Sequence, residues 1–578
     1  MSLGRFVLPV LLACSLLLQA PGATAESAAS ESPVAEPVAW GAATARSRIA
    51  KPPADVPLNH WSYPLLERLE ARGVIDIDLS TRPVSRSDVA AAVSAAQGPE
   101  APASGFLSAR EEWLLSRLVA EFVRREVDSP AFSTGTAAAS LGLGIRASAQ
   151  IRHGGEAVEL DLWPGSAPGG ITPLRDVGVD VGDGAGRDVG ISVGDDAQLD
   201  VASDISCEMW GGVEGFLGFY ADAQLLLGGQ DGARKVQLSS RVRTWNGMSA
   251  SSERAYFKLK RPSYSIVAGR RGTAWGRSRW GRLMLSGTAP TFDQVNARYE
   301  VGALSFEAMH AFLEYEELGT ETDLGDAESV FLAAHRMVVR GKWGSVGLGE
   351  AVVYSSVLPD PVYVNPLMPY YMAQHNERSD DNVLWQLDCV YHIRPGLTAY
   401  GEFLVDDLQY ERWTDHPDKY GLTLGGAWYG AVRGVDAELT TEYTNVRNWT
   451  YTHKQTEHRF AQDGLPIGFE LGPDADRFRA EFVFHPALKW SVGTTYEHAR
   501  KGYGRITDPF EPGDNPEPAF PSGVVESTDR VGVELGYQSL ERVAVGLGAA
   551  FESAANVGNI LGMDDDGWEF WAGVEFRI

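Results

Sequence analysis

The spacing of apolar residues changes once along the chain. Between His60 and about Asp128 they recur at the helical interval, and beyond residue 130 they alternate with polar residues, as in a β-strand. The stretch GVDAELTTEYTN separates into two faces. One face holds Val435, Ala437, Leu439, Thr441 and Tyr443, and the other holds Asp436, Glu438, Thr440, Glu442 and Thr444. The pattern predicts a mainly β chain that begins with a small helical part.

The same alternation recurs in LTAYGEFLVDD, LKWSVGTTYEH and VGVELGYQSLERVAVGLGAAF. Strands of about ten residues, with Trp and Tyr near their ends and carboxylates on the polar face, are typical of a barrel that crosses a bilayer. A soluble β-sandwich, whose apolar faces pack on a core, is the alternative. We predict a transmembrane antiparallel outer-membrane β-barrel.

The last strand supports this prediction. WAGVEFRI places Gly573, Phe576 and Ile578 at a spacing that resembles the carboxy-terminal signal of bacterial outer-membrane barrels, with Ile in place of a terminal Phe. We therefore expect a Gram-negative outer-membrane location. The expected partners there are outer-membrane lipid, lipopolysaccharide and the barrel-assembly machinery.

The amino terminus predicts export. A basic start at Arg5, an apolar run over residues 6–18 and the exit ATA are typical of a secretory signal peptide. Cleavage at LLAC, which would leave Cys14 as a lipidated terminus, is the alternative. The patterns divide the chain into a signal peptide (1–25), a flexible linker rich in Ala, Pro, Ser and Glu (26–58), a helical periplasmic domain (59–128) and the barrel (129–578).

The helical part carries two helix-start signals. Ser108 and Glu111 form a capping box ahead of an apolar face, and Ser85 with Asp88 forms a looser one. The apolar face after the first signal comprises Leu114, Leu115, Leu118, Val119, Phe122 and Val123. These signals predict a few packed helices, and the simplest interpretation is a helical cap without chemistry of its own.

Charge and cysteine content narrow the possible partners. The net charge of −27 disfavours nucleic acid, because phosphates would be repelled. Once a signal peptide is removed, Cys207 and Cys389 remain, and two free thiols are favoured over one disulfide. The segment 176–200 is rich in Gly and Asp but matches no calcium-binding loop, so a solvated connection is favoured. We expect no metal site and no cofactor.

Signatures of enzymes are missing from the sequence. It contains no H-E-x-x-H and no phosphate-binding glycine loop, and its G-x-S-x-G match at residues 190–194 lies in a Gly- and Asp-rich segment and not at the strand-to-helix turn of a nucleophile elbow. Asp406 and Asp407 are adjacent, so on a strand they point to opposite faces and cannot act as an acid and base pair. We expect no catalytic residue. A barrel-embedded hydrolase, with Ser, His and a carboxylate brought together by the fold, is the alternative.

The run AWGRSRWGRLMLSGTAPTFDQV (274–295) is too polar for a core and too aromatic for a plain loop. At a barrel end or in the lumen, its rings could cover the C–H faces of a sugar while guanidinium groups bind hydroxyls or carboxylates. Alternatively, the tryptophans anchor at the lipid interface and the arginines pair with lumen carboxylates. The candidate polysaccharide-binding residues here are Trp275, Arg277, Arg279 and Trp280.

A family resemblance extends this idea. AGRRGTAWGRSRWGRLMLSGTAPTFDQV, VVYSSVLPDPVYVNPLMPYYMAQHN, SDDNVLWQLDCVY and GLTAYGEFLVDD resemble successive blocks of the Wzi capsule-assembly family of outer-membrane proteins, over roughly residues 264–410. The resemblance implies a barrel of about eighteen strands, a helical part at its periplasmic end, no cofactor, and a non-catalytic, lectin-like role in holding capsular polysaccharide or exopolysaccharide. The second block adds the candidates Tyr363, Asn365, Tyr370 and Tyr371.

A second resemblance concerns the helical part. VPLNHWSYPLLERLEARGVID followed by RPVSRSDVAAAVSAA is similar to one S-layer homology module. This similarity implies binding to peptidoglycan or another wall polymer, with Trp61, Arg86 and Asp88 as candidate residues. It also supports an alternative function, a porin for small solutes that carries a wall-binding module.

Overall fold

The computed structural model describes residues 53–98, 107–124, 132–134, 137–153, 197–213, 216–227, 244–245, 248–314, 329–408, 416–538 and 543–577. The predicted signal peptide, most of the predicted linker, nearly all of the Gly- and Asp-rich segment and Ile578 lie outside these residues. None of the helices within them is long and apolar enough to cross a bilayer.

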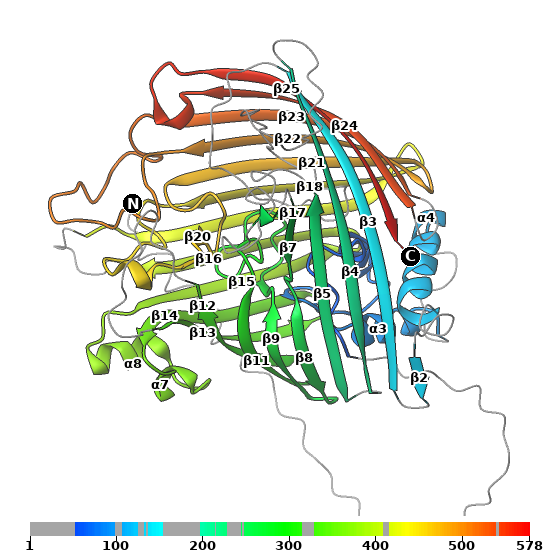
Figure 1. Ribbon diagram of the computed structural model, residues 1–578, viewed down its shortest axis with the longest axis horizontal. Helices are drawn as coiled ribbons and strands as arrows, with labels where there is room; N and C mark the ends of the chain where they lie inside the picture. Colours follow the sequence, from blue (N-terminus) through cyan, green and yellow to red (C-terminus); the bar gives the residue numbers. More distant parts are fainter. Residues whose placement is uncertain are drawn as a thin grey trace, which may run out of the picture. The chain divides into compact units, whose positions relative to one another are not determined.

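Eighteen of the strands in the described residues form one antiparallel ring in which each strand pairs with the next (Figure 1). They are β3 (Ala137–His153), β4 (Ala197–Val213), β5 (Leu217–Leu227), β8 (Ala255–Lys260), β9 (Tyr264–Arg271), β11 (Phe292–Val301), β12 (Leu304–Leu313), β13 (Ser329–Gly341), β14 (Gly344–Ser356), β15 (Asn382–Arg394), β16 (Leu397–Asp407), β17 (Lys419–Val432), β18 (Val435–Val446), β21 (Ala475–Ala487), β22 (Trp490–Lys501), β23 (Glu526–Gln538), β24 (Val543–Ala555) and β25 (Asp565–Arg577). β25 pairs with β3, so the order of paired strands returns to its start. The predicted β-barrel fold is confirmed.

Short strands complete the sheets. β2 (Phe132–Thr134) pairs with β3, and β6 (Thr244–Trp245) and β7 (Met248–Ser251) extend the sheet beside β5. Two small two-stranded sheets are separate from the strand pairing of the ring. One pairs β1 (Thr81–Arg82) with β10 (Ala274–Trp275), and the other pairs β19 (Ala461–Gln462) with β20 (Leu465–Pro466).

The two faces of the ring differ as the alternation predicts. On β18, Thr440, Glu442 and Thr444 are buried, whereas Leu439 and Tyr443 are exposed on the other face. The same exposed rows continue on other strands, at Trp490, Tyr496, Val531, Val533, Leu535 and Leu547. Apolar side chains therefore point outward and polar ones inward, which is the reverse of a soluble sandwich.

The two ends of the ring differ in their connections. At one end, called the turn end, short turns join β11 to β12, β13 to β14, β15 to β16, β17 to β18 and β21 to β22. At the other, the loop end, the connections are long and contain α7 (Pro361–Val364), α8 (Tyr370–Glu377), η3 (Thr456–His458) and η4 (Val557–Asn559). In outer-membrane barrels the short turns face the periplasm and the long loops face outward.

The amino-terminal helices form a separate core, called the helical module. It comprises α2 (Ser62–Ala71), α3 (Arg86–Ala95), α4 (Ala109–Leu118) and the π-helical turn η1 (Val119–Arg124). Its core includes Tyr63, Leu66, Leu69, Val89, Val93, Leu115, Leu118 and Phe122. The Ser108–Glu111 capping box is confirmed, with Glu111 N donating to Ser108 Oγ at 3.2 Å. Ser85 is the N-cap of α3, as predicted, but its hydroxyl donates to the carbonyl of Pro53 and makes no capping hydrogen bond, so the box itself is wrong.

The predicted flexible linker (26–58) is wrong in its last six residues. Val56 N donates to the carbonyl of Val84 at 2.8 Å, and Asp55 is buried and pairs with Lys258 and, at 2.6 Å, with Arg271. Asp55 supplies the carboxylate that balances these two cations, so this part of the chain is fixed to the barrel. Cys207 on β4 and Cys389 on β15 are both free.

The exposed apolar rows on the outward face predict that an added charge destabilises the barrel more on that face than on the inward face. V533R on β23 should lower the free energy of unfolding in lipid vesicles by about 2–4 kcal/mol, because it places a guanidinium in the apolar band. E534K, at the next residue, changes a charge on the inward face and should cost less. Equal losses in a denaturant titration of the two variants would contradict the assignment of faces.

Candidate functional site

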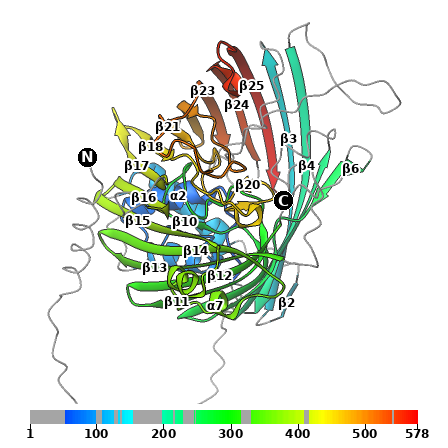
Figure 2. The ribbon, with the colours of Figure 1, turned by 90° about the vertical axis from the view of Figure 1, so that its left-hand side faces the viewer.

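The sequence AWGRSRWGR lies inside the ring. The connection 272–291, called the inserted loop, leaves the loop end after β9 and returns there to β11. Between these points it reaches the helical module: Trp275 pairs with Thr81, and Arg277 Nη2 lies 2.9 Å from Glu70 Oε2 on α2. Figure 2 shows β10 and α2 close together. The loop therefore runs from the loop end toward the turn end through the interior.

Two carboxylates of the wall hold the backbone of the inserted loop. Glu402 on β16 accepts from Ser278 N at 3.2 Å and from Leu283 N at 3.0 Å. Glu442 on β18 accepts from Arg279 N at 2.8 Å and from Trp280 N at 3.1 Å. Buried N–H groups outside regular structure need such acceptors. Four of them are satisfied here by two side chains of the polar face.

Two glycines allow this close approach. A Cβ atom on Gly276, whose φ is +95°, would lie 2.1 Å from Glu402 Oε1, and one on Gly281 would lie 1.9 Å from Thr444 Oγ1. Thr423 Oγ1 donates to the carbonyl of Gly281 at 2.6 Å. The glycines that are spaced along this run are therefore needed for contact with the wall.

The arginines of the inserted loop pair with carboxylates. Arg279 lies 2.5 Å from Glu481 on β21 and 3.3 Å from Glu67 on α2. Burial by itself would lower the pKa of Arg279, but Glu481 and Glu67 raise that pKa above its usual range. Glu70 and Glu67 likewise raise the pKa of Arg277 against the effect of burial. The alternative in which these arginines pair with interior carboxylates is confirmed.

The two tryptophans are interior side chains. Trp275 is 0% exposed and Trp280 is 6% exposed. Trp275 packs with Leu283 and Leu285 in the interior core, and Trp280 lies under the guanidinium of Arg479. Neither ring has a face available to a polymer, and neither lies at the lipid interface. Burial therefore does not favour the predicted sugar-stacking role, and Arg277 and Arg279 are engaged in ion pairs.

A second connection closes the loop end. The segment 447–474, called the mouth loop, covers the inserted loop. Tyr451 Oη donates to the carbonyl of Leu283 at 2.6 Å, and Ser286 N donates to that of Ile467 at 3.1 Å. Phe460, Ile467 and Phe469 join the same core as Trp275. Within the described residues, the interior on this side is packed with apolar side chains.

The helical module docks at the turn end through ion pairs. Arg68, which is 1% exposed, lies 2.9 Å from Asp436 and 3.2 Å from Glu438 on β18. Asp78 accepts from Arg298 on β11 at 2.9 Å. Burial would raise the pKa of Asp78, but the cation of Arg298 outweighs burial and lowers that pKa to about 2.

The candidate wall-binding residues belong to this docking. Arg86 is buried, pairs with Glu121 at 2.5 Å and stacks on Trp210 of β4. Asp88 is partly exposed and pairs with Lys260 of β8, and Trp61 lies under the guanidinium of Arg117. These contacts give the three side chains a structural role. Binding to a wall polymer stays a prediction, and the contacts do not favour it.

The candidates of the second family block lie elsewhere. Tyr363 and Tyr370 are buried against the wall, Asn365 is exposed and accepts from Leu367 N, and Tyr371 is 49% exposed. All four belong to the α7–α8 connection, outside the ring, whereas the inserted loop is inside it. The structure thus separates the two predicted groups by the barrel wall.

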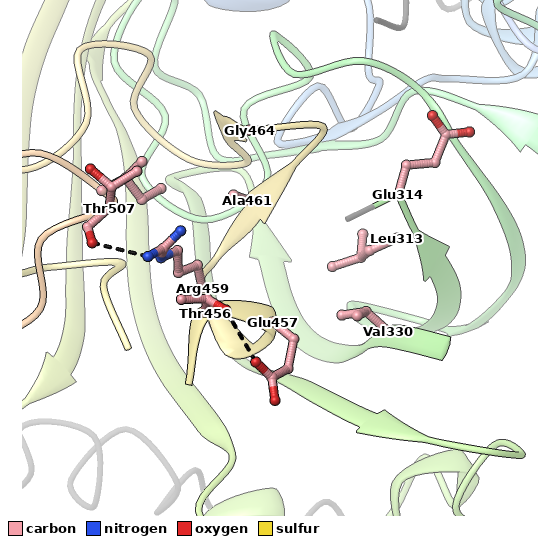
Figure 3. Close-up of a pocket in the computed structure, with 10 residues that line it drawn as sticks. Leu313, Glu314, Val330, Thr456, Glu457, Arg459, Ala461, Gly464 and Thr507 are labelled. Atoms are coloured by element: carbon pink, nitrogen blue, oxygen red, sulfur yellow. Dashed lines mark hydrogen bonds between the residues drawn. The ribbon is translucent and has the colours of Figure 1, made fainter. Parts of the chain in front are cut away.

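A pocket at the loop end combines charged, hydroxyl and apolar groups (Figure 3). It is lined by Leu313, Glu314, Val330, Thr456, Glu457, Arg459, Ala461, Gly464, Ile506 and Thr507. Arg459 donates to the carbonyl of Thr507 at 3.0 Å, but its buried Nε has no hydrogen-bond partner in the described residues. Gln462 lies next to the lining, and its buried Nε2 also has no hydrogen-bond partner in the described residues. Such orphan donors suit an oxygen-rich ligand.

Sequence reasoning missed this pocket. Its lining comes from the ends of β12 and β13, from the mouth loop and from the connection 502–525. These segments share no motif, and only the barrel brings them together. Glu457 and Arg459 near an aromatic residue were the available signal, but that combination is common in loops.

Comparisons with known proteins agree on the fold. No family model and no curated protein matches this chain. The solved structure of Wzi, described as an outer membrane protein involved in group 1 capsule assembly in Escherichia coli and a carbohydrate-binding β-barrel, is similar to it. The TM-score is 0.57, the identity is 13%, and the match covers 91% of this chain and 99% of Wzi.

Solved structures of OprD and OpdQ from Pseudomonas aeruginosa also match. Each covers 76% of this chain with a TM-score of 0.39, at 13% and 11% identity, and the matches span 95% and 98% of those chains. These scores are too low to carry an argument. The likeness to Wzi shows the fold alone, and in that respect the resemblance expected from the sequence is confirmed.

The contacts of the inserted loop predict how it can be released. E402A/E442A leaves four buried N–H groups without acceptors, at about 1–3 kcal/mol for each. Trypsin should then cut after the arginines of residues 277–282, where the parent protein resists. E569A, which removes an interior carboxylate paired with Arg530, is the control. Equal resistance of the double variant and the parent would contradict this role of the carboxylates.

The lowered pKa of Asp78 predicts an acid dependence of docking. The ionised Asp78 stabilises the folded, docked state by about 2 kcal/mol. This stabilisation is present above the ordinary pKa of 3.8 and is lost as the pH falls toward 2. Pepsin cleavage of residues 53–98 should therefore increase over this range in the parent, whereas D78N should be cleaved readily throughout. The control is D76N, since Asp76 pairs with Arg340 but is 91% exposed. A parallel response of D78N and the parent would count against the proposed ion pair.

Proposed function

We propose that the protein is an outer-membrane β-barrel of a Gram-negative cell that binds capsular polysaccharide or exopolysaccharide at its loop end and catalyses no reaction. The predicted signal peptide supports export. The outward apolar rows at residues such as Val531 and Leu547 supply the surface that a bilayer requires. Lipid, lipopolysaccharide and the barrel-assembly machinery are partners that this location implies.

The orientation follows from the connections. Short turns face the periplasm in such barrels. The helical module docks at the turn end through Arg68 and Asp78, so it lies on the periplasmic side in this proposal. Peptidoglycan is the weakest of the proposed partners, because the buried Arg86 already pairs with Glu121.

The observation that carries the proposal is the filled interior. A porin conducts through a water-filled lumen. Here the inserted loop and the mouth loop occupy the interior, held by Glu402, Glu442 and Tyr451, and the helical module docks at the turn end. Within the described residues, the surface left for a polymer is therefore the loop end and not a channel. The Wzi barrel, which its description calls carbohydrate-binding, supports the same function by analogy of fold.

The chemistry of the loop-end pocket suits a sugar chain. Glu314 and Glu457 offer acceptors, Arg459 and Thr507 offer donors or hydroxyls, and Leu313 with other aliphatic side chains offers an apolar surface. Sugar rings present hydroxyls at their edges and C–H groups on their faces, so they need this mixture. The guanidinium of Arg459, which lines the pocket, would pair with a hydroxyl or a uronic acid carboxylate.

The proposal predicts a localised loss of glycan binding. R459A should weaken binding of purified surface polysaccharide by about tenfold or more, because a charge-assisted hydrogen bond is lost. R394A, which removes an exposed arginine at the turn end, is the matched control and should bind normally. The measurement is a binding titration on the purified barrel in detergent.

Two results would oppose this proposal. Unchanged affinity in R459A would exclude the pocket as the binding site. A steady open conductance of the parent protein in planar bilayers would favour the porin alternative, because the proposal expects the core around Leu283 and Tyr451 to close the part of the interior that the structure describes.

A further inference from the structure

The connection between β14 and β15 folds onto the outside of the wall. Its helices α7 and α8 (Figure 1), here called the α7–α8 hairpin, bury Tyr363 and Tyr370 against Phe331 and Tyr354. The next residues along those strands, such as Leu332, belong to the interior core. Because successive side chains of a strand point to opposite faces, the hairpin packs on the outward, apolar face of the ring.

A polar anchor holds the hairpin there. Glu350 on β14 accepts from Tyr370 N and Tyr371 N, each at 2.8 Å, at the start of α8. Its carboxylate also lies 3.2 Å from Nε2 of His335 on β13, whose ring packs on Tyr370 at a centroid distance of 4.4 Å. A carboxylate and an imidazole facing hydrocarbon would be costly. The hairpin covers both groups and donates two hydrogen bonds to the carboxylate.

The hairpin is itself a defined structure. Asp360 caps α7 by accepting from Val362 N at 2.8 Å, and Tyr363 Oη donates to Asp381 at 2.5 Å. The hydroxyl of Tyr354 on the wall accepts from Asp360 N at 3.1 Å. These contacts fix both ends of the hairpin to the strands that it joins.

The outer surface of the hairpin is apolar. Its exposed side chains include Val357, Leu358, Val364, Leu367 and Met372, of which Leu358 and Leu367 are 72% and 78% exposed. Exposed polar residues, His375, Asn376, Glu377 and Arg378, follow at the end of α8. An apolar surface that ends in polar groups is typical of a segment at the boundary between acyl chains and headgroups.

This surface is continuous with the apolar rows of the wall. The ring of Tyr371 meets the edge of Trp385 on β15 at 6.0 Å, and Trp385 is directly paired with Glu350. Trp385, Phe312 and Leu348 are themselves about half exposed on the outward face. Acyl chains that cover the outward face of the wall at these residues would therefore also contact the hairpin.

We propose that the α7–α8 hairpin is a membrane-interface element that inserts Leu358, Leu367 and Met372 among the acyl chains next to the lipid headgroups. This inference rests on the proposed outer-membrane location. It gives the predicted candidates Tyr363, Tyr370 and Tyr371 a role in holding the hairpin on the wall.

The test measures contact between the hairpin and acyl chains. Leu367 is replaced by Cys (L367C) in a chain whose other cysteines are Ser, labelled with a small fluorophore, and reconstituted into phosphatidylcholine vesicles with brominated acyl chains. L348C on the outward face of β14 is the positive control, and L465C in the mouth loop is the negative control. Quenching at L367C should be within about twofold of that at L348C.

Each outcome decides one question. Quenching at L348C and L367C but not at L465C supports the proposal. Quenching at L348C alone overturns it, whether water or a second copy of the chain covers the hairpin, and a water-soluble quencher then separates those two cases. No quenching at L348C contradicts the proposed membrane location itself, which is a different failure.

Discussion

The structure depends on two carboxylates of the inner wall that accept hydrogen bonds from a loop. Glu402 and Glu442 bind four N–H groups of the inserted loop, which would otherwise be buried without partners. That contact places Arg279 between Glu481 of the wall and Glu67 of the helical module. Barrel, loop and helices are therefore joined by one interior network, and the mouth loop packs on its apolar side.

This network explains why the polar face of each strand is rich in acids. In a conducting barrel, interior charges would be solvated by water in the lumen. Here several of them are paired with arginines: Glu481 pairs with Arg279 of the inserted loop, and Asp388 pairs with Arg336 of β13, which also donates to Thr81 of β1. In the proposed function, glycan recognition is therefore assigned to the loop-end pocket, and contact with lipid to the α7–α8 hairpin on the outward face.

Local patterns predicted the strands, their two faces and the helix start at Ser108, because alternation and capping depend on neighbouring residues. The interior position of AWGRSRWGR could not be predicted. Glu402 lies 124 residues from Ser278 in the sequence, and nothing local marks it as an acceptor. The pocket around Arg459 and the outward folding of Tyr370 depend in the same way on closure of the ring.

The central claim is that the inserted loop is a buried part of the barrel. Amide hydrogen exchange of the intact protein in lipid tests it most directly. We expect the N–H groups of Ser278, Arg279, Trp280 and Leu283 to exchange as slowly as those of the neighbouring strands, although they lie in no strand or helix. Exchange at the rate of an exposed loop would show that the carboxylates do not hold them, and would contradict the account.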